Sequence, residues 1–160
     1  MSNDPAERLK SLGSQLRKLH RLVLETEKQF HPPMGQLELL DRLLKDPAWA
    51  WLRPLSALAA DVEHIAAAKP APTAFDMAIA AAQIRDLLVG EGTEENKNFA
   101  ERYVPLIQAS AELASVHGEL RQRLKDAPAE SSDEAERLHL RHQWAMRCKH
   151  ESSDTSRRRH

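Results

Sequence analysis

Two carboxylate–histidine pairs are the residues whose types and spacing come nearest to a known chemistry. Glu136 and His139 stand three residues apart, as do Asp61 and His64. On a helix this spacing places both side chains on one face, and helical bundles hold two metal ions with two Glu-x-x-His pairs and further carboxylates. However, one pair begins with aspartate and the other lies in a polar segment outside the expected core. Chance spacing is the better account, so we predict no metal and no cofactor.

A lone thiol, Cys148, is the next candidate for chemistry. It is the only cysteine, so no intramolecular disulfide can form and nothing points to an oxidising compartment. Arg147 and Lys149 would lower the pKa of this thiol. His139 and His142 share a helix face nearby, but the four-ligand spacing of a closed zinc site is missing. We therefore predict no catalytic residue, while a reactive surface thiol stays open.

The densest pattern in the chain is Asp46-Pro-Ala-Trp-Ala-Trp-Leu-Arg-Pro-Leu-Ser-Ala-Leu. Its first two residues are typical of a helix start. Pro54 falls inside the helical pattern and predicts a kink, or a break into two segments, just before it. We take Trp49, Trp51 and Arg53 as candidate binding residues, the arginine for an anion or a partner's carboxylate. The plainer alternative is an arginine that only reaches water.

His117 is the fourth candidate binding residue. It stands beside the apolar stripe of the last long helical pattern. A core or boundary histidine that hydrogen-bonds a neighbour is the plainer interpretation, and a ligand-binding histidine is the sharper one. Tyr103, the only tyrosine, is expected to pack with its hydroxyl at the rim of the core.

The segments that carry these residues all have sequence patterns typical of helices. Alanine and leucine dominate the 160 residues, glycines number five, and 41% of the residues are hydrophobic. This composition favours helix over sheet, and the length suits one domain with a real core. We predict an all-α, mostly antiparallel bundle of four main helices, one short helix and a peripheral C-terminal helix. The four main helices are predicted over 4–30, 46–68, 73–89 and 93–125.

The first helix carries an apolar stripe at spacings of three and four, formed by Leu9, Leu12, Leu16, Leu19 and Val23. The stripe is one wall of a bundle core or the seam of a dimeric coiled coil, and flanking leucines favour the wall.

The C-terminal part of the chain changes in composition after the bundle domain at 1–125. Residues 126–133 have the composition of a linker, and 134–150 that of a polar peripheral helix that docks by Trp144. Residues 151–160 are typical of a disordered tail. Within the last main helix, Pro105 predicts a bend.

The run Leu43-Leu-Lys-Asp-Pro-Ala-Trp-Ala-Trp-Leu-Arg-Pro-Leu-Ser56 resembles a segment in a group of uncharacterised bacterial helical proteins. Two shorter runs, Phe99-Ala-Glu-Arg-Tyr-Val104 and Val116-His-Gly-Glu-Leu-Arg121, extend the resemblance. It implies a compact bacterial helical bundle and brings no activity, substrate or cofactor.

The balance of charge argues against nucleic acid as the partner, since the formal net charge is −1. No signal peptide or membrane span is visible, so we expect a cytoplasmic protein with no membrane partner. We predict a non-enzymatic bacterial protein that acts by protein–protein interaction or regulation. It would use a surface near the tryptophans, or self-association of the first helix as a homodimer. The alternative is a small-molecule or metal-binding bundle with a sensing or redox role.

Overall fold

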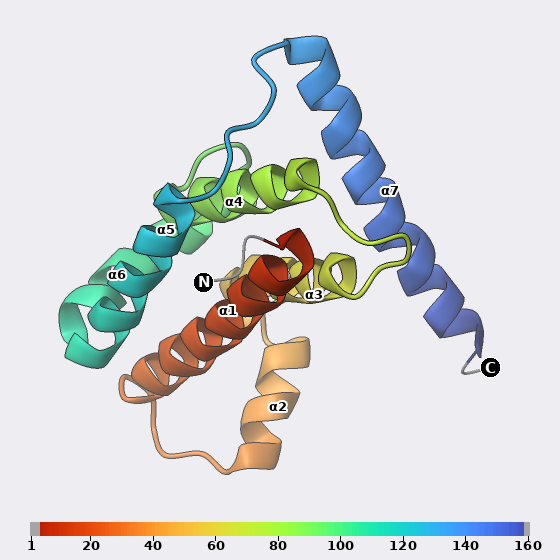
Figure 1. Cartoon of the computed structure of the whole chain (residues 1–160). Helices are drawn as coiled ribbons and strands as arrows, with labels where there is room; N and C mark the ends of the chain where they lie inside the picture. The colour runs from red at the N-terminus through yellow and green to blue at the C-terminus, as the bar shows by residue number, and fades with distance from the viewer. Residues whose placement is uncertain (1–3, 159–160) are drawn as a thin grey trace.

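The computed structural model describes the backbone of residues 4–158 and the side chains of residues 4–149. Within that part the chain is all-α, with seven α-helices packed against one another, one short 3-10 helix and no strand (Figure 1). The predicted fold class is therefore confirmed. The elements are α1 (Pro5–Lys28), α2 (Gln36–Lys45), η1 (Pro47–Leu52), α3 (Arg53–Ala66), α4 (Ala74–Val89), α5 (Glu94–Ala109), α6 (Ala111–Lys125) and α7 (Glu134–Arg158).

Helix α1 is the centre of the bundle. It packs along α3 and also contacts α4, α5 and α6. Its apolar stripe is fully buried, with Leu9, Leu16, Leu19 and Val23 each 0% exposed. The stripe is thus a wall of the chain's own core, and the folded chain does not offer it for a coiled coil with a second copy.

The tryptophan segment breaks into two elements, which is one of the two predicted outcomes. Asp46 accepts a hydrogen bond from the Ala48 N–H at 2.9 Å and starts η1, a 3-10 helix. Helix α3 then begins at Arg53, with Pro54 in its first turn. Proline has no N–H to donate and suits the first turn of a helix, where that hydrogen bond is not needed.

The predicted single helix over 93–125 is wrong, because the chain forms α5 and α6 there. Pro105 lies inside α5, and the break comes at Ser110, whose backbone is extended. The Ser110 hydroxyl accepts a hydrogen bond from the Leu113 N–H at 3.2 Å and so caps α6. The local cap, and not the proline, decides where the helix ends.

Helix α7 packs on α3 and α4 at one edge of the bundle (Figure 1). Trp144, which was predicted to dock this helix, is buried at 2% exposed. Arg147 donates to the carboxylate of buried Asp76 on α4 at 3.1 Å. The backbone of α7 continues to Arg158, past the predicted end at 150. The side chains after 149 are not described, so the tail over 151–160 stays a prediction.

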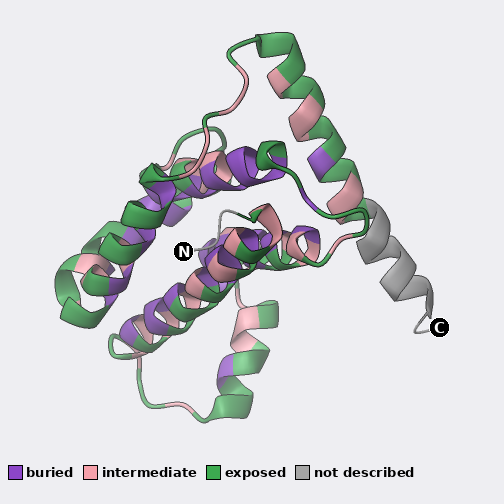
Figure 2. Ribbon diagram, viewed as in Figure 1, coloured by how far each residue is buried: buried purple, intermediate pink, exposed green. Residues whose placement is uncertain are grey.

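Buried residues follow the inner sides of the bundle helices, whereas α2 is largely exposed and projects from the bundle (Figures 1 and 2). None of the described helices is both long and apolar enough to cross a membrane.

Candidate functional site

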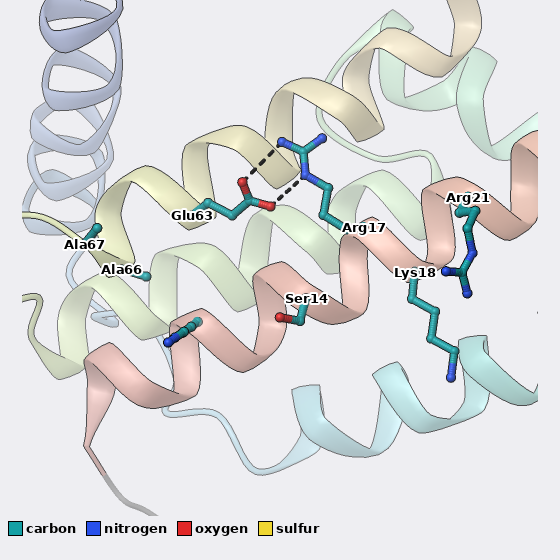
Figure 3. A pocket seen from close by; sticks show the side chains of 8 residues that line it. Ser14, Arg17, Lys18, Arg21, Glu63, Ala66 and Ala67 are labelled. Carbon is teal, nitrogen blue, oxygen red and sulfur yellow. Dashed lines mark hydrogen bonds and ion pairs between the residues drawn. The ribbon is translucent and has the colours of Figure 1, made fainter. Parts of the chain in front are cut away.

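A groove of about 930 Å³ lies between the outer side of α1 and the C-terminal end of α3 (Figure 3). We call it the α1–α3 groove, and its lining is Lys10, Ser14, Arg17, Lys18, Arg21, Glu63, Ala66 and Ala67. Four of these side chains are cationic and one is a carboxylate. The whole chain, in contrast, has 23 lysines and arginines against 24 aspartates and glutamates. The groove is therefore a local concentration of positive charge.

The spacing of the cationic residues along α1 explains why they share one side of the helix. Lys10, Arg17 and Arg21 are separated by seven and four residues, which are near whole turns of an α-helix, and Lys18 lies beside them. This line faces away from the buried leucine stripe, and its residues are exposed. At 1.5 Å per residue, the axis from Lys10 to Arg21 is about 16 Å long.

Gly13 allows the close approach of α1 and α3 that places Glu63 at the groove. A Cβ atom added at Gly13 would lie 3.0 Å from Cγ of Glu63 and 3.8 Å from the Val62 side chain. A larger residue would have to push Glu63 aside. The glycine therefore helps to bring a carboxylate on α3 within reach of Arg17 on α1.

Arg17 and Glu63 form the ion pair in this groove. Nε of Arg17 donates to one carboxylate oxygen at 2.6 Å and Nη2 donates to the other at 3.3 Å, a bidentate geometry. The hydrogen bond with Glu63 raises the pKa of Arg17 above its ordinary value. The two side chains are 45% and 44% exposed, and water-exposed pairs contribute only about 0–1 kcal/mol. The pair can therefore open at little cost.

The other three cations of the groove, Lys10, Lys18 and Arg21, make no hydrogen bond or ion pair with any described residue. In Figure 3, Lys18 and Arg21 point away from the Arg17–Glu63 pair. The groove thus presents one arginine that already holds a carboxylate and three cations open to another anion. This arrangement of charges is one that can bind several anionic groups along a line.

The structure brings together two of the four predicted binding residues. Trp51 and Arg53 line a second hollow of about 540 Å³, together with Glu95, Glu101 and Arg102 of α5 and others. The Trp51 side chain is only 9% exposed and packs on Phe99. Arg53 is exposed, and its Nη2 donates to the Leu44 carbonyl oxygen at 3.2 Å. Arg53 thus contacts the last turn of α2, and its role in binding stays a prediction.

The other two predicted binding residues lie elsewhere. Trp49 is 1% exposed, and its ring lies 4.7 Å from that of His31. His117 is half-buried, and its Nδ1 is 2.8 Å from the hydroxyl of Tyr103. Burial raises the pKa of Tyr103, and burial followed by the charge of Arg121 lowers the pKa of His117. Both groups are therefore neutral near pH 7, and the tautomer of His117 decides which of them donates the hydrogen bond.

The residues considered for metal or thiol chemistry do not assemble into a metal site. Among the described side chains, no group of three or more histidines, cysteines, aspartates or glutamates could hold a metal ion. Cys148 is partly buried and forms a hydrogen bond with Asp61. Burial raises the pKa of Asp61 and outweighs that hydrogen bond, which lowers it. The contact joins α7 to α3.

Sequence reasoning missed the cationic residues of the groove. One signal was present, because residues 8–24 contain five lysines and arginines and no aspartate or glutamate. The sequence pattern of α1 does not indicate that Glu63, which belongs to another helix, lies beside these cations.

Comparison with family models, curated proteins and solved structures gives no match for this chain. The resemblance of the tryptophan segment to bacterial helical proteins therefore stays an expectation. What the protein does has to be argued from its own residues.

Proposed function

We propose that this protein is a non-enzymatic interaction protein that binds an acidic segment of another protein along the α1–α3 groove. The observation that carries the proposal is the gathering of four cations with one carboxylate in a chain of nearly balanced charge. A patch of this kind attracts and orients an oppositely charged partner. The reducing bacterial cytoplasm, which a single cysteine suits, is the compartment we propose.

An acidic protein segment fits the groove better than a nucleic acid does. A chain with a net charge of −1 has no overall attraction for the dense phosphates of a nucleic acid. The small apolar side chains of Ala66 and Ala67 lie beside the cations and suit the aliphatic parts of a peptide. Arg17 already binds a carboxylate, that of Glu63, in bidentate geometry.

Glu63 is an internal competitor in this proposal. A carboxylate of the partner replaces it at Arg17, and the cost is small because the pair is half-exposed. Replacing Glu63 by glutamine frees Arg17 before the partner arrives. The variant should therefore bind an acidic partner more tightly than the wild type.

The test uses a fluorescein-labelled, alanine-based helical peptide with four glutamates on one face, followed by fluorescence anisotropy. Glu63→Gln should tighten binding about threefold, the range of one exposed ion pair. Glu119→Gln makes the same change of net charge at an exposed position on α6 and should leave binding at the wild-type value. Lys10→Gln with Lys18→Gln should weaken binding about fivefold. The matched control, Lys97→Gln with Lys125→Gln, should change it little.

Two results would refute the proposal. In the first, a permuted peptide with its glutamates spread around the helix binds as tightly as the original peptide, and Glu63→Gln does not change the binding. The other is tighter binding of a single-stranded oligonucleotide of the same charge, which would assign the groove to nucleic acid.

A further inference from the structure

The hollow beside Arg53 has one wall that follows from the 3-10 geometry of η1. A 3-10 helix has three residues per turn, so residues three apart lie one above another. Trp49 and Leu52 form the row that belongs to the core, at 1% and 2% exposed. The other two rows, continued into the start of α3, line the hollow with Pro47, Ala48, Ala50, Trp51, Arg53 and Pro54. Because only one of these six residues carries a charge, this wall suits the apolar parts of a ligand.

The other wall comes from α5 and carries charges of both signs. Glu95, Asn98 and Arg102 are separated by three and four residues, so they lie along one face of α5. Glu101 lines the hollow as well. Together with Arg53, the lining has two guanidinium groups and two carboxylates, and thus no net charge. This balance favours a ligand that itself carries both charges over a simple anion or a simple cation.

The polar groups of the hollow are open to a ligand. Among the described side chains, those of Glu95, Glu101 and Arg102 form no hydrogen bond or ion pair with another residue. Arg53 uses Nη2 for a backbone carbonyl oxygen of α2, which leaves its other N–H groups. The buried indole Nε1 of Trp51 has no hydrogen-bond partner in the described part of the chain. Buried donors almost always have an acceptor, and a ligand can supply the one that this indole lacks.

The spacing of the charges along α5 indicates the length of that ligand. Glu95 and Arg102 are seven residues apart, which is about 10 Å along the helix axis. An extended peptide of three residues also spans about 10 Å. The volume of the hollow, about 540 Å³, lies within the range of small-molecule sites, about 300–1,000 Å³.

We propose that the hollow beside Arg53 binds a short peptide of about three residues with free ends. The ammonium group of the peptide lies at Glu95 and its carboxylate at Arg102. Asn98 stands between these two residues, and its amide can both donate to and accept from the peptide bonds. A peptide carbonyl oxygen accepts the N–H of Trp51, and small apolar side chains pack on the wall formed by η1.

A titration of the whole chain with trialanine, followed in a ¹H–¹⁵N correlation spectrum, tests the proposal. Backbone signals of η1 and of residues 95–102 should shift and saturate, with a Kd below about 1 mM for a ligand of this size. The indole N–H signal of Trp51 should shift more than that of Trp144. Acetylation of the peptide removes its ammonium group and amidation removes its carboxylate, and each change should weaken binding about fivefold.

Two variants assign the ends of the peptide to their partners. Glu95→Gln should weaken binding about fivefold, and acetylation of the peptide should then have no further effect, because the partner of its ammonium group is gone. Arg102→Gln should remove the effect of amidation in the same way. Glu94→Gln and Lys97→Gln make the same changes of net charge at exposed positions of α5 outside the hollow, and they should leave binding unchanged.

Three results would overturn the proposal. Trialanine at about ten times the expected Kd shifts none of these signals. A peptide with both ends blocked, or acetate alone, gives the same shifts at the same concentration. Glu95→Gln still discriminates against the acetylated peptide as strongly as the wild type does. The proposal is independent of the function proposed for the α1–α3 groove, because no residue lines both.

Discussion

Arg17 and Glu63, the pair at which we propose that a partner binds, differ from a structural ion pair in their exposure. Their contact is half-exposed, so an incoming carboxylate can take the place of Glu63 at little cost. Arg147 and Asp76 make a pair at 3.1 Å that ties α7 to α4, and the aspartate is buried. Opening that pair would leave a buried charge without its cation, which is costly. Exposure, more than distance, therefore separates the two roles.

His117 gives the stability of the protein a pH dependence of known sign. Because its pKa is lowered in the folded state by burial and by Arg121, the unfolded chain takes up a proton at a higher pH than the folded chain does. The free energy of unfolding should therefore fall as the pH drops below about 6.5, until folded His117 is protonated as well. Urea unfolding at a series of pH values between about 8 and about 5 measures this slope.

Replacing His117 by glutamine should make that slope shallower, since glutamine does not titrate. Some slope should remain, because burial followed by the charge of Arg17 also lowers the pKa of His20. His142→Gln, at an exposed position on α7, should leave the profile unchanged. A His117→Gln profile as steep as that of the wild type would contradict this account.

Helix α6 depends on a cap that the hydrophobic pattern does not reveal. Ser110→Ala removes the hydroxyl that accepts the Leu113 N–H, so the free energy of unfolding should fall by about 1 kcal/mol. Ser115→Ala makes the same substitution at an exposed interior position of α6, where alanine is the better helix former. It should be neutral or slightly stabilising. Equal effects of the two substitutions in urea unfolding would mean that the cap is not needed.

Most elements could be predicted because their ends carry strong local signals. Asp46 before a proline and Thr73 before Asp76 both start helices, and both contacts are formed. The leucine period of α1 identified a core wall. The break at Ser110 was missed because one serine within a long helical pattern is a weak signal, while Pro105 is a strong one. Proline was tolerated inside α5, whereas the serine ended it.

The molecule as a whole balances its charges in number but not in space. A net charge of −1 conceals a cationic line on α1. The groove also depends on a contact between Arg17 and Glu63, which stand 46 residues apart. Periodicity reports which face of one helix is buried, but it does not report which helix lies beside it. The candidate site was therefore beyond prediction from single-helix patterns, although the fold class was not.

The most direct test of the proposed function is a two-dimensional ¹H–¹⁵N correlation spectrum of the whole chain, recorded while the acidic helical peptide is added. The account predicts that backbone signals from Lys10 to Arg21, and those near Glu63, move progressively and saturate. Signals of α5 and of the hollow beside Arg53 should stay in place. Uniform small shifts over all exposed lysines and arginines, or shifts gathered at Arg53 and Arg102, would contradict the assignment of the α1–α3 groove as the binding surface.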